Sequence, residues 1–388
     1  MAYLKSVFAR LAARLAARLA ASSRATKVAW LARLVVAGVL CSWPAAPRPL
    51  LVLGPPQTVE TNHPILCVHT RLTDEVEPWK VLRTLELVRQ MGATTIVEYF
   101  PWAYMEGIQD SYGWGHADMI VDFARNQGLT VVARLGMVPA WARKLPDNTA
   151  TTDTYLAPEH YADFANFVQA FVAHFKGRVK SIVIWNEPNL TLEWGFRPPD
   201  PEGYTALLKL AYARAKEADP NILVLGGALA PTLEPEGSDL AMNDLTYLER
   251  MYQAGAGAYF DILAVHAYGL TFPPDEPPAP DVLDFRRVEL VREVMVRHGD
   301  AAKPVMVTES GWNDSPRWTM AVRPAARIDD TIGSYAWAEQ HWPWAQNICS
   351  WAFRYPAPQH SYGDYFTFVS PEFQPKLIYD AVKAWATK

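Results

Sequence analysis

Residues 180–189 read KSIVIWNEPN, a short apolar and β-branched run that ends in polar residues and a proline. Such a run is typical of a buried parallel strand, and the proline marks its end. Seven further runs of this kind follow or precede it, and longer amphipathic stretches separate them. Alternating strand and helix signals predict repeated β/α units around a parallel sheet.

The eight predicted strands are PILCVHT (64–70), TTIVEYF (94–100), LTVVARLG (129–136), KSIVIWNEP (180–188), NILVLGGAL (221–229), DILAVHAY (261–268), PVMVTESG (304–311) and NICSWAFRY (347–355). Eight such units predict the α/β class and a single-domain (β/α)8 TIM barrel over residues 61–388. The proline-rich residues 271–280 follow the sixth strand, so we expect a loop on the C-terminal face, where active sites of this fold lie.

Two glutamates end matching strands of this predicted barrel. Because alternate residues of a strand share a face, we expect both carboxylates to continue the inward faces and to meet across the mouth. The expected inward sets are Val183, Trp185 and Glu187 on the fourth strand and Val305, Val307 and Glu309 on the seventh. A single glutamate at a strand end is more often a surface charge or an ion pair. The matched pair instead indicates a catalytic site.

Glycoside hydrolysis needs such a pair, because one carboxyl group protonates the leaving oxygen while the other attacks the anomeric carbon. Asn186 stands beside Glu187, and its amide is suited to donate to a sugar 2-hydroxyl. The chain also carries 15 Trp and 17 Tyr, and aromatic faces are surfaces on which sugars stack.

The motifs WNEPN (185–189) and TESGW (308–312) resemble the acid/base and nucleophile motifs of clan A of the retaining glycoside hydrolases. This clan holds the cellulase-like family five and the xylosidase-like family thirty-nine, and the resemblance spans roughly residues 65–388 in order and spacing. It implies a glycosidase that hydrolyses O-glycosyl compounds by double displacement, with Glu187 as general acid/base and Glu309 as nucleophile. His266 and Tyr268 are similar to the clan's residues that bind substrate and nucleophile, and Trp351 resembles its sugar-stacking platform.

Three more residues at strand ends are candidates for substrate binding. Arg134 ends the third strand and could hold the nucleophile ionised through a charge-assisted hydrogen bond. His69 and Glu98 end the first and second strands and are expected to touch substrate. His266 could instead be a core histidine and Trp351 a core aromatic, but their positions at strand ends favour the site.

Neither a metal nor a cofactor is expected, since the nine histidines show no HExxH pair or other ligand spacing. The net charge of −5 provides no basic field, so nucleic acid is not an expected partner. The expected substrate is an oligosaccharide or polysaccharide with β linkages, in an extended cleft with several subsites. The loop aromatics expected to form these subsites are Trp102, Tyr104, Tyr112, Trp114, Trp141 and Trp194.

Two other functions are compatible with these residues. A transglycosylase would use the same two glutamates and transfer the sugar to a hydroxyl group rather than to water. A carbohydrate-binding protein without turnover is disfavoured, because such proteins usually lose one carboxylate.

Residues 1–60 carry a basic leader pattern, with no acidic residue before Glu60. Eight basic residues precede it: Lys5, Arg10, Arg14, Arg18, Arg24, Lys27, Arg33 and Arg48. We interpret the segment as a signal peptide or membrane anchor with a linker. This interpretation predicts an extracellular or cell-surface protein, with residues 1–60 as its possible membrane attachment. The alternatives are an amphipathic surface helix and a true start codon further downstream.

The three cysteines, Cys41, Cys67 and Cys349, are too few for a disulfide framework and are interpreted as free thiols. Cys67 and Cys349 fall on the neighbouring first and last strands and are expected to point into the barrel as small core residues.

Overall fold

The computed structural model describes Ser23, residues 53–143 and residues 151–388. The chain divides into two units, residues 1–52 and residues 53–388, and the second unit holds the barrel. Most of the predicted leader lies outside the described residues and stays a prediction. Within the described residues, no helix has both the length and the apolar character needed to cross a membrane.

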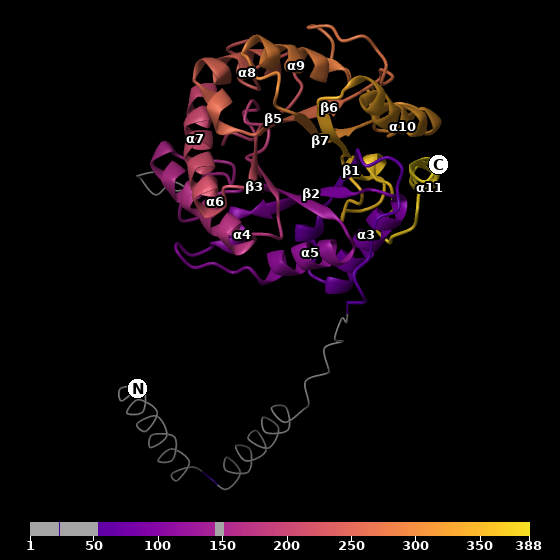
Figure 1. Cartoon of the computed structure of the whole chain (residues 1–388), viewed down its shortest axis with the longest axis horizontal. Coiled ribbons are helices and arrows are strands. Elements are labelled where there is room, and N and C mark those ends of the chain that lie inside the picture. Colours follow the sequence, from indigo (N-terminus) through magenta and orange to yellow (C-terminus); the bar gives the residue numbers. More distant parts are fainter. Residues whose placement is uncertain (1–22, 24–52, 144–150) are drawn as a thin grey trace. The chain divides into compact units, whose positions relative to one another are not determined.

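Eight strands close into a barrel in which each strand pairs in parallel with the next and the last pairs with the first (Figure 1). The strands are β1 (Leu66–His69), β2 (Thr95–Pro101), β3 (Thr130–Gly136), β4 (Ser181–Ile184), β5 (Leu223–Leu229), β6 (Ile262–Tyr268), β7 (Val305–Gly311) and β8 (Ala345–Ser350). This architecture confirms the predicted (β/α)8 TIM barrel.

Helices surround the strands on the outside of the barrel (Figure 1). The α-helices are α3 (Pro78–Met91), α4 (Trp102–Met105), α5 (Gly115–Asn126), α6 (Tyr161–His174), α7 (Pro201–Ala218), α8 (Asp244–Gln253), α9 (Arg287–Arg297), α10 (Pro324–His341) and α11 (Leu377–Ala386). The 3₁₀ helices are η1 (Leu72–Asp74), η2 (Pro158–His160), η3 (Ala256–Tyr259) and η4 (Gly363–Phe366). Residues 271–280 contain no helix or strand, as expected for a loop after β6.

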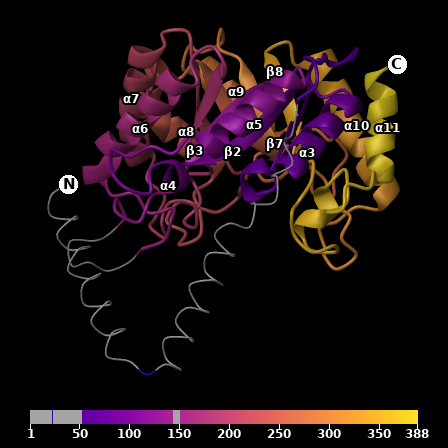
Figure 2. The ribbon, with the colours of Figure 1, turned by 90° about the horizontal axis from the view of Figure 1, so that it is seen from below.

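Local sequence signals explain where several helices begin and end. The carboxylate of Asp200 caps α7 by accepting a hydrogen bond from the backbone N–H of Gly203, and Pro201 occupies the first turn. Gly92 ends α3 with φ at 96°. A Cβ at this position would lie 2.7 Å from the Cβ of Ala386, so glycine also permits α11 to pack beside α3 (Figure 2).

Two apolar layers follow from the alternation of side chains along the strands. The outer layer lies between strands and helices and holds most of the buried apolar residues. The inner layer fills the barrel and consists of Cys67, Val97, Val132, Val183, Leu225, Ala228, Ile262, Ala264, Met306 and Cys349. Each strand contributes to the inner layer, so these residues define which face of every strand points inward.

The expected alternation is wrong for the seventh strand. Met306 belongs to the inner layer, whereas Val305 and Val307 pack in the outer layer. Glu309 nevertheless faces the barrel mouth, because the register with β6 shifts between Val307 and Glu309 and leaves one extra residue, Thr308. A β-bulge of this kind reverses the facing of all residues that follow it.

The expectation for Trp185 is also wrong. The strand β4 ends at Ile184, and Trp185 leaves it with φ at 72°. Its indole packs in the outer layer, 5.8 Å from the ring of Trp194, and donates a hydrogen bond to the carbonyl oxygen of Glu193. Glu187 therefore reaches the mouth through a turn rather than through strand alternation.

Cys67 and Cys349 form a disulfide bond, which corrects the interpretation of all three cysteines as free thiols. The two residues are direct partners in the β1–β8 register, and their Cα atoms lie 4.2 Å apart. Both side chains point into the barrel, as expected. Adjacent inward positions on neighbouring strands bring two sulfur atoms together even when 282 residues separate them in sequence.

This bond predicts the number of thiols and a contribution to stability. Three cysteines less the two in the bond leave one thiol per chain, so thiol titration in denaturant should find one without reductant and three after reduction. Because the bond closes a long loop, Cys349→Ser should lower the free energy of unfolding by roughly 2–5 kcal/mol. Three thiols in the unreduced protein would contradict this pairing.

Candidate active site

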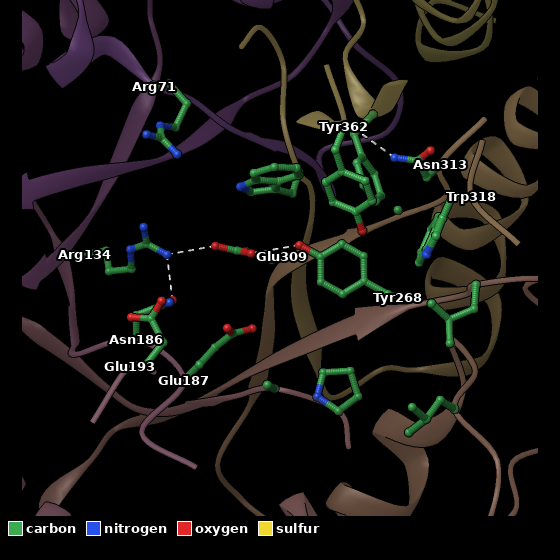
Figure 3. A pocket seen from close by; sticks show the side chains of 17 residues that line it. Arg71, Arg134, Asn186, Glu187, Glu193, Tyr268, Glu309, Asn313, Trp318 and Tyr362 are labelled. Atoms are coloured by element: carbon green, nitrogen blue, oxygen red, sulfur yellow. Dashed lines mark hydrogen bonds and ion pairs between the residues drawn. The ribbon is translucent and has the colours of Figure 1, made fainter. Parts of the chain in front are cut away.

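A cavity of about 430 Å³ opens at the C-terminal mouth of the barrel, and both Glu187 and Glu309 line it (Figure 3). Its size falls within the range of small-ligand sites, roughly 300–1,000 Å³. The residues of its wall that the sequence analysis named are Arg134, Asn186, Glu187, Tyr268, Glu309 and Trp351.

Hydrogen bonds hold the Glu187 turn against the end of β5 and the loop that follows it. The backbone N–H of Glu187 donates to the carbonyl oxygen of Ala228 at 2.9 Å. Asn189 is fully buried, and its amide donates to the carbonyl oxygens of Ala230 and Met242 and accepts from the N–H of Ala230. The WNEPN segment therefore holds Glu187 on a fixed turn, as a site built for a defined geometry requires.

Both oxygens of Glu309 accept a hydrogen bond. Arg134 Nη1 donates to Oε1 at 2.8 Å, and the hydroxyl group of Tyr268 donates to Oε2 at 2.8 Å (Figure 3). Burial raises the pKa of Glu309, but the positive charges of His266 and Arg134 and the hydrogen bond from Tyr268 outweigh it, and the pKa falls well below its usual range. Glu309 is thus held as a carboxylate with fixed orientation.

His266 connects the two glutamates. Its Nδ1 lies 2.7 Å from Oε1 of Glu187 and 3.8 Å from Oε2 of Glu309. Burial lowers the pKa of His266, but the charges of Glu309 and Glu187 outweigh burial and raise it. Ala264 of the same strand lies in the inner layer, so His266 and Tyr268 continue the inward face, as expected.

His69 lies behind Glu309 rather than in the cavity wall, although it was expected to touch substrate. Its side chain is fully buried, with Nε2 3.6 Å from Oε1 of Glu309. Burial lowers the pKa of His69 to about 3, so the ring is neutral at ordinary pH. Neither ring nitrogen finds a hydrogen-bond partner among the described residues.

The expectation that Glu98 touches substrate is wrong. The neighbouring Val97 points into the barrel, so Glu98 points outward, where it is fully buried. Its carboxylate accepts hydrogen bonds from the hydroxyl group of Thr70 and from the backbone N–H groups of Leu72 and Thr73. Glu98 therefore supports the chain after β1 rather than the cavity.

Trp351 lines the cavity directly after the end of β8, two residues beyond the inward-facing Cys349. Its ring centroid lies 5.2 Å from that of Phe366 and 5.6 Å from that of Tyr355. The indole is partly exposed, as a platform for a sugar must be.

The six loop aromatics expected to form subsites do not line the cavity. Trp102 and Trp194 are buried in the outer layer, and the indole N–H of Trp141 donates to the carbonyl oxygen of Glu106. Tyr112 and Trp114 stack on each other with centroids 5.1 Å apart. These five residues pack against neighbouring side chains, because large aromatic rings gain more from packing together than from exposure. Tyr104 is exposed but lies outside the cavity wall.

Other wall residues lie mostly on loops, and the sequence did not predict them as site residues. Those with polar or aromatic side chains are Arg71, Glu193, Asn313, Trp318, Tyr362 and Phe366, and the first five are labelled in Figure 3. Loop residues follow no hydrophobic period, so nothing in the sequence ranks one above its neighbours. The one feature of the sequence that pointed to any of these residues was the position of Glu193, six residues after Glu187.

One group among the described residues could in principle hold a cation. One atom each of Glu187, His266 and Glu309 lie within 4.8 Å of one another. One oxygen of Glu187 and both oxygens of Glu309 already take part in hydrogen bonds with His266, Arg134 and Tyr268. We therefore assign no metal to these residues.

Tyr268→Phe should lower kcat/KM by roughly 10- to 100-fold, because a hydrogen bond to a charged group is worth about 1.5–3 kcal/mol. The hydroxyl group of Tyr268 lowers the pKa of Glu309, so its removal raises that pKa. An attacking carboxylate must be ionised, and the acidic limb of the profile of kcat/KM against pH should move to higher pH. Rates measured from acidic to neutral pH check both effects.

Tyr335→Phe provides the matched control for this substitution. Tyr335 is also a buried tyrosine, but its hydroxyl group bonds Ser350 at 2.7 Å and does not line the cavity. Removal of the Tyr335 hydroxyl group should lower the free energy of unfolding and leave the acidic limb of the kcat/KM profile at the same pH. A limb that fails to move in Tyr268→Phe would refute the assigned effect on Glu309.

Comparison with known proteins finds similarity to glycoside hydrolases. The model of glycosyl hydrolase family 10 matches residues 71–225, a stretch that includes Glu187 and ends before Glu309. A comparison with curated proteins gives no match. The family match supports the predicted enzyme class, a glycosidase.

Solved structures share the fold at low identity. A family 39 glycoside hydrolase from Bacteroides cellulosilyticus WH2 is 21% identical with a TM-score of 0.67, and the alignment covers 86% of this chain and 65% of that one. A family 39 enzyme from Xanthomonas axonopodis pv. citri is 19% identical with a TM-score of 0.60, over 87% and 71% of the two chains. A psychrophilic family 10 endo-β-1,4-xylanase is 18% identical with a TM-score of 0.55, over 84% and 96%.

This chain thus spans slightly less than two thirds of the length of the Bacteroides enzyme. Structural similarity at these identities confirms the barrel. Together with the family 10 match, it also confirms the resemblance to clan A glycoside hydrolases.

Proposed function

We propose that this chain is a retaining glycoside hydrolase that cleaves β-linked oligosaccharides or polysaccharides by double displacement. The observation that carries the proposal is the spacing of the two carboxyl groups. One oxygen of Glu187 lies within 4.8 Å of one oxygen of Glu309. Retaining enzymes hold their carboxyl groups about 5–5.5 Å apart, whereas inverting enzymes leave about 6.5–9.5 Å for a water molecule.

In the first step, Glu309 attacks the anomeric carbon while Glu187 protonates the leaving oxygen. Glu309 suits the attack because Arg134 and Tyr268 keep it ionised and oriented. The bond between the anomeric carbon and the leaving oxygen breaks, and the bond to a Glu309 oxygen forms. The product of this step is a glycosyl ester on Glu309.

In the second step, Glu187 takes a proton from water, and the resulting nucleophile breaks the ester at the anomeric carbon. Two inversions give net retention of configuration. His266 is placed to orient Glu187 in both steps, because its Nδ1 lies 2.7 Å from a Glu187 oxygen. Trp351 offers an apolar face for a sugar ring beside these groups.

The test uses the full-length chain with a panel of β-linked aryl glycosides and polysaccharides. Turnover in which the first product keeps the β configuration, observed by proton NMR, would support the proposal. A first product of inverted configuration would refute it. Added sugar acceptors distinguish hydrolysis from transglycosylation, because only a transglycosylase would form mainly new glycosides.

A further inference from the structure

Arg71 places a charged side chain in the cavity wall on the far side from Glu187. It follows β1, whereas the Glu187 turn is bonded to Ala228 of β5. In the closed barrel, β1 lies across the mouth from β5, because three strands separate them in either direction. Figure 3 accordingly shows Arg71 and Glu187 on opposite sides of Glu309.

Asp74 and Tyr355 hold the guanidinium group of Arg71 in place. Nε of Arg71 donates to Oδ2 of Asp74 at 2.7 Å, and Nη2 lies 2.7 Å from the same oxygen. The guanidinium carbon lies 5.0 Å from the centroid of the Tyr355 ring, and this ring lies 5.6 Å from that of Trp351. Tyr355 thus joins Arg71 to the aromatic side chain proposed to stack on the sugar at Glu309.

This arrangement leaves hydrogen-bond donors of Arg71 available. A guanidinium group has five N–H donors in a planar fork. Among the described residues, Asp74 is its hydrogen-bond partner and engages the edge formed by Nε and Nη2. The N–H groups of Nη1 and the second N–H of Nη2 stay free, and 28% of the side chain is exposed. Two parallel N–H groups on neighbouring nitrogen atoms suit two adjacent oxygen atoms.

The charges around Arg71 favour a neutral ligand. Three carboxyl groups and two guanidinium groups line the cavity, and Asp74 offsets the charge of Arg71 from outside its wall. An anionic substituent would therefore meet more carboxyl groups than guanidinium groups. Neighbouring hydroxyl groups of a neutral sugar accept the same two N–H groups without this repulsion.

Double displacement determines which part of a substrate lies beside Arg71. Glu187 protonates the leaving oxygen, so the leaving group occupies the side of the cavity that holds Glu187. Sugar units on the other side stay attached to the ring that Glu309 attacks. Arg71 lies on that side, one aromatic ring beyond Trp351. It is therefore placed beside a second sugar unit rather than beside the ring that reacts.

We propose that Arg71 donates two hydrogen bonds to neighbouring hydroxyl groups of a second sugar unit, one linkage away from the ring that Glu309 attacks. The proposal rests on the proposed function, because it takes the direction of the substrate from the roles of the two glutamates. It narrows the substrate to neutral saccharides that keep at least two sugar units on the Glu309 side. The chain then cleaves inner linkages in preference to removing a terminal single sugar.

Aryl glycosides of one neutral sugar and of its β-linked disaccharide test this subsite in the full chain. The readout is kcat/KM for the disaccharide glycoside divided by kcat/KM for the monosaccharide glycoside. This ratio should be roughly 10 to 100 in wild type, as expected for hydrogen bonds from a charged group, and about 1 in Arg71→Ala. Arg71→Lys keeps the charge but lacks the planar fork, so its ratio should also fall.

Arg83→Ala is the matched control. Arg83 also pairs with a carboxylate three residues further on, Glu86 at 3.2 Å, but it lies on α3 outside the cavity wall. Its ratio should equal that of wild type. An unchanged ratio in Arg71→Ala, or a wild-type ratio in Arg71→Lys, would overturn the proposal. These results would leave the proposed function intact, whereas a wild type that hydrolyses no glycoside would overturn that function and the subsite with it.

Product analysis with wild type alone does not depend on the folding of any variant. The substrate is a neutral β-linked oligosaccharide labelled at its reducing end. We expect the first product released from the unlabelled end to contain at least two sugar units. Stepwise release of single sugars from that end would show that no second unit is required, and the proposal would fail.

Discussion

Glu309→Gln is expected to lower kcat by on the order of 10⁵-fold, because loss of a covalent nucleophile removes the reaction path itself. The amide of glutamine cannot form the glycosyl ester, although it fills the same space beside Arg134 and Tyr268. The measurement is turnover of the best aryl glycoside, with circular dichroism to show that the variant is folded.

Glu98→Gln provides the control for the loss of a buried carboxyl group. Glu98 is fully buried but lies outside the cavity, where it accepts hydrogen bonds from the chain after β1. Its replacement should lower the free energy of unfolding by roughly 1–3 kcal/mol while kcat stays near that of wild type. Wild-type activity in Glu309→Gln would refute the nucleophile assignment.

Glu187→Ala is expected to lower kcat/KM by about 10²- to 10⁴-fold, the usual contribution of a general acid/base. The loss should be smallest for aryl glycosides with acidic leaving groups, because these need little protonation. The second step lacks its base, and a small anion such as azide can enter the space of the lost carboxyl group. Azide should therefore restore turnover and yield a glycosyl azide of retained configuration.

The product of azide rescue separates the roles of the two glutamates. A β-glycosyl azide from Glu187→Ala supports Glu187 as acid/base. Rescue of Glu309→Ala instead should give the α-glycosyl azide, since azide would then replace the nucleophile. The opposite pairing of variant and product would exchange the two assignments.

The sequence predicted the barrel and the two carboxylates for physical reasons that the structure makes clear. Strand and helix periodicity is a local property, and eight repeats leave few topologies open. Strand ends converge at the mouth of any such barrel, so residues at the ends of six strands meet there whatever the details of packing. Arg134, His266 and Tyr268 share their inward faces with inner-layer residues. Arg134 and Tyr268 contact Glu309 as expected, whereas the hydrogen bond of His266 joins Glu187.

The errors arise where the backbone departs from regular alternation. The extra residue Thr308 turns Glu309 inward, and no sequence period signals a bulge. Trp185 leaves its strand with positive φ, which a tryptophan rarely adopts. The disulfide was missed although Cys67 and Cys349 were placed on neighbouring inward positions, because the pairing depends on a register that sequence does not specify.

The cavity wall shows a different limit. Glu193 and Arg71 come from loops whose course is set by buried contacts distant in sequence, such as the indole of Trp185 on the Glu193 backbone. Several large aromatics near the mouth were predicted to form sugar subsites, yet Trp102 and Trp194 are buried. Composition identifies residues able to bind sugars but not which of them are exposed.

The most direct test of the central claim is to trap the glycosyl ester on the full chain. A 2-deoxy-2-fluoro glycosyl fluoride of the preferred sugar slows the second step more than the first, and mass spectrometry of intact protein and peptides locates the label. We expect one added glycosyl unit per chain, on the peptide that contains Glu309. Label on Glu187 or Glu193, or no adduct in a preparation that turns over the parent glycoside, would contradict double displacement through Glu309.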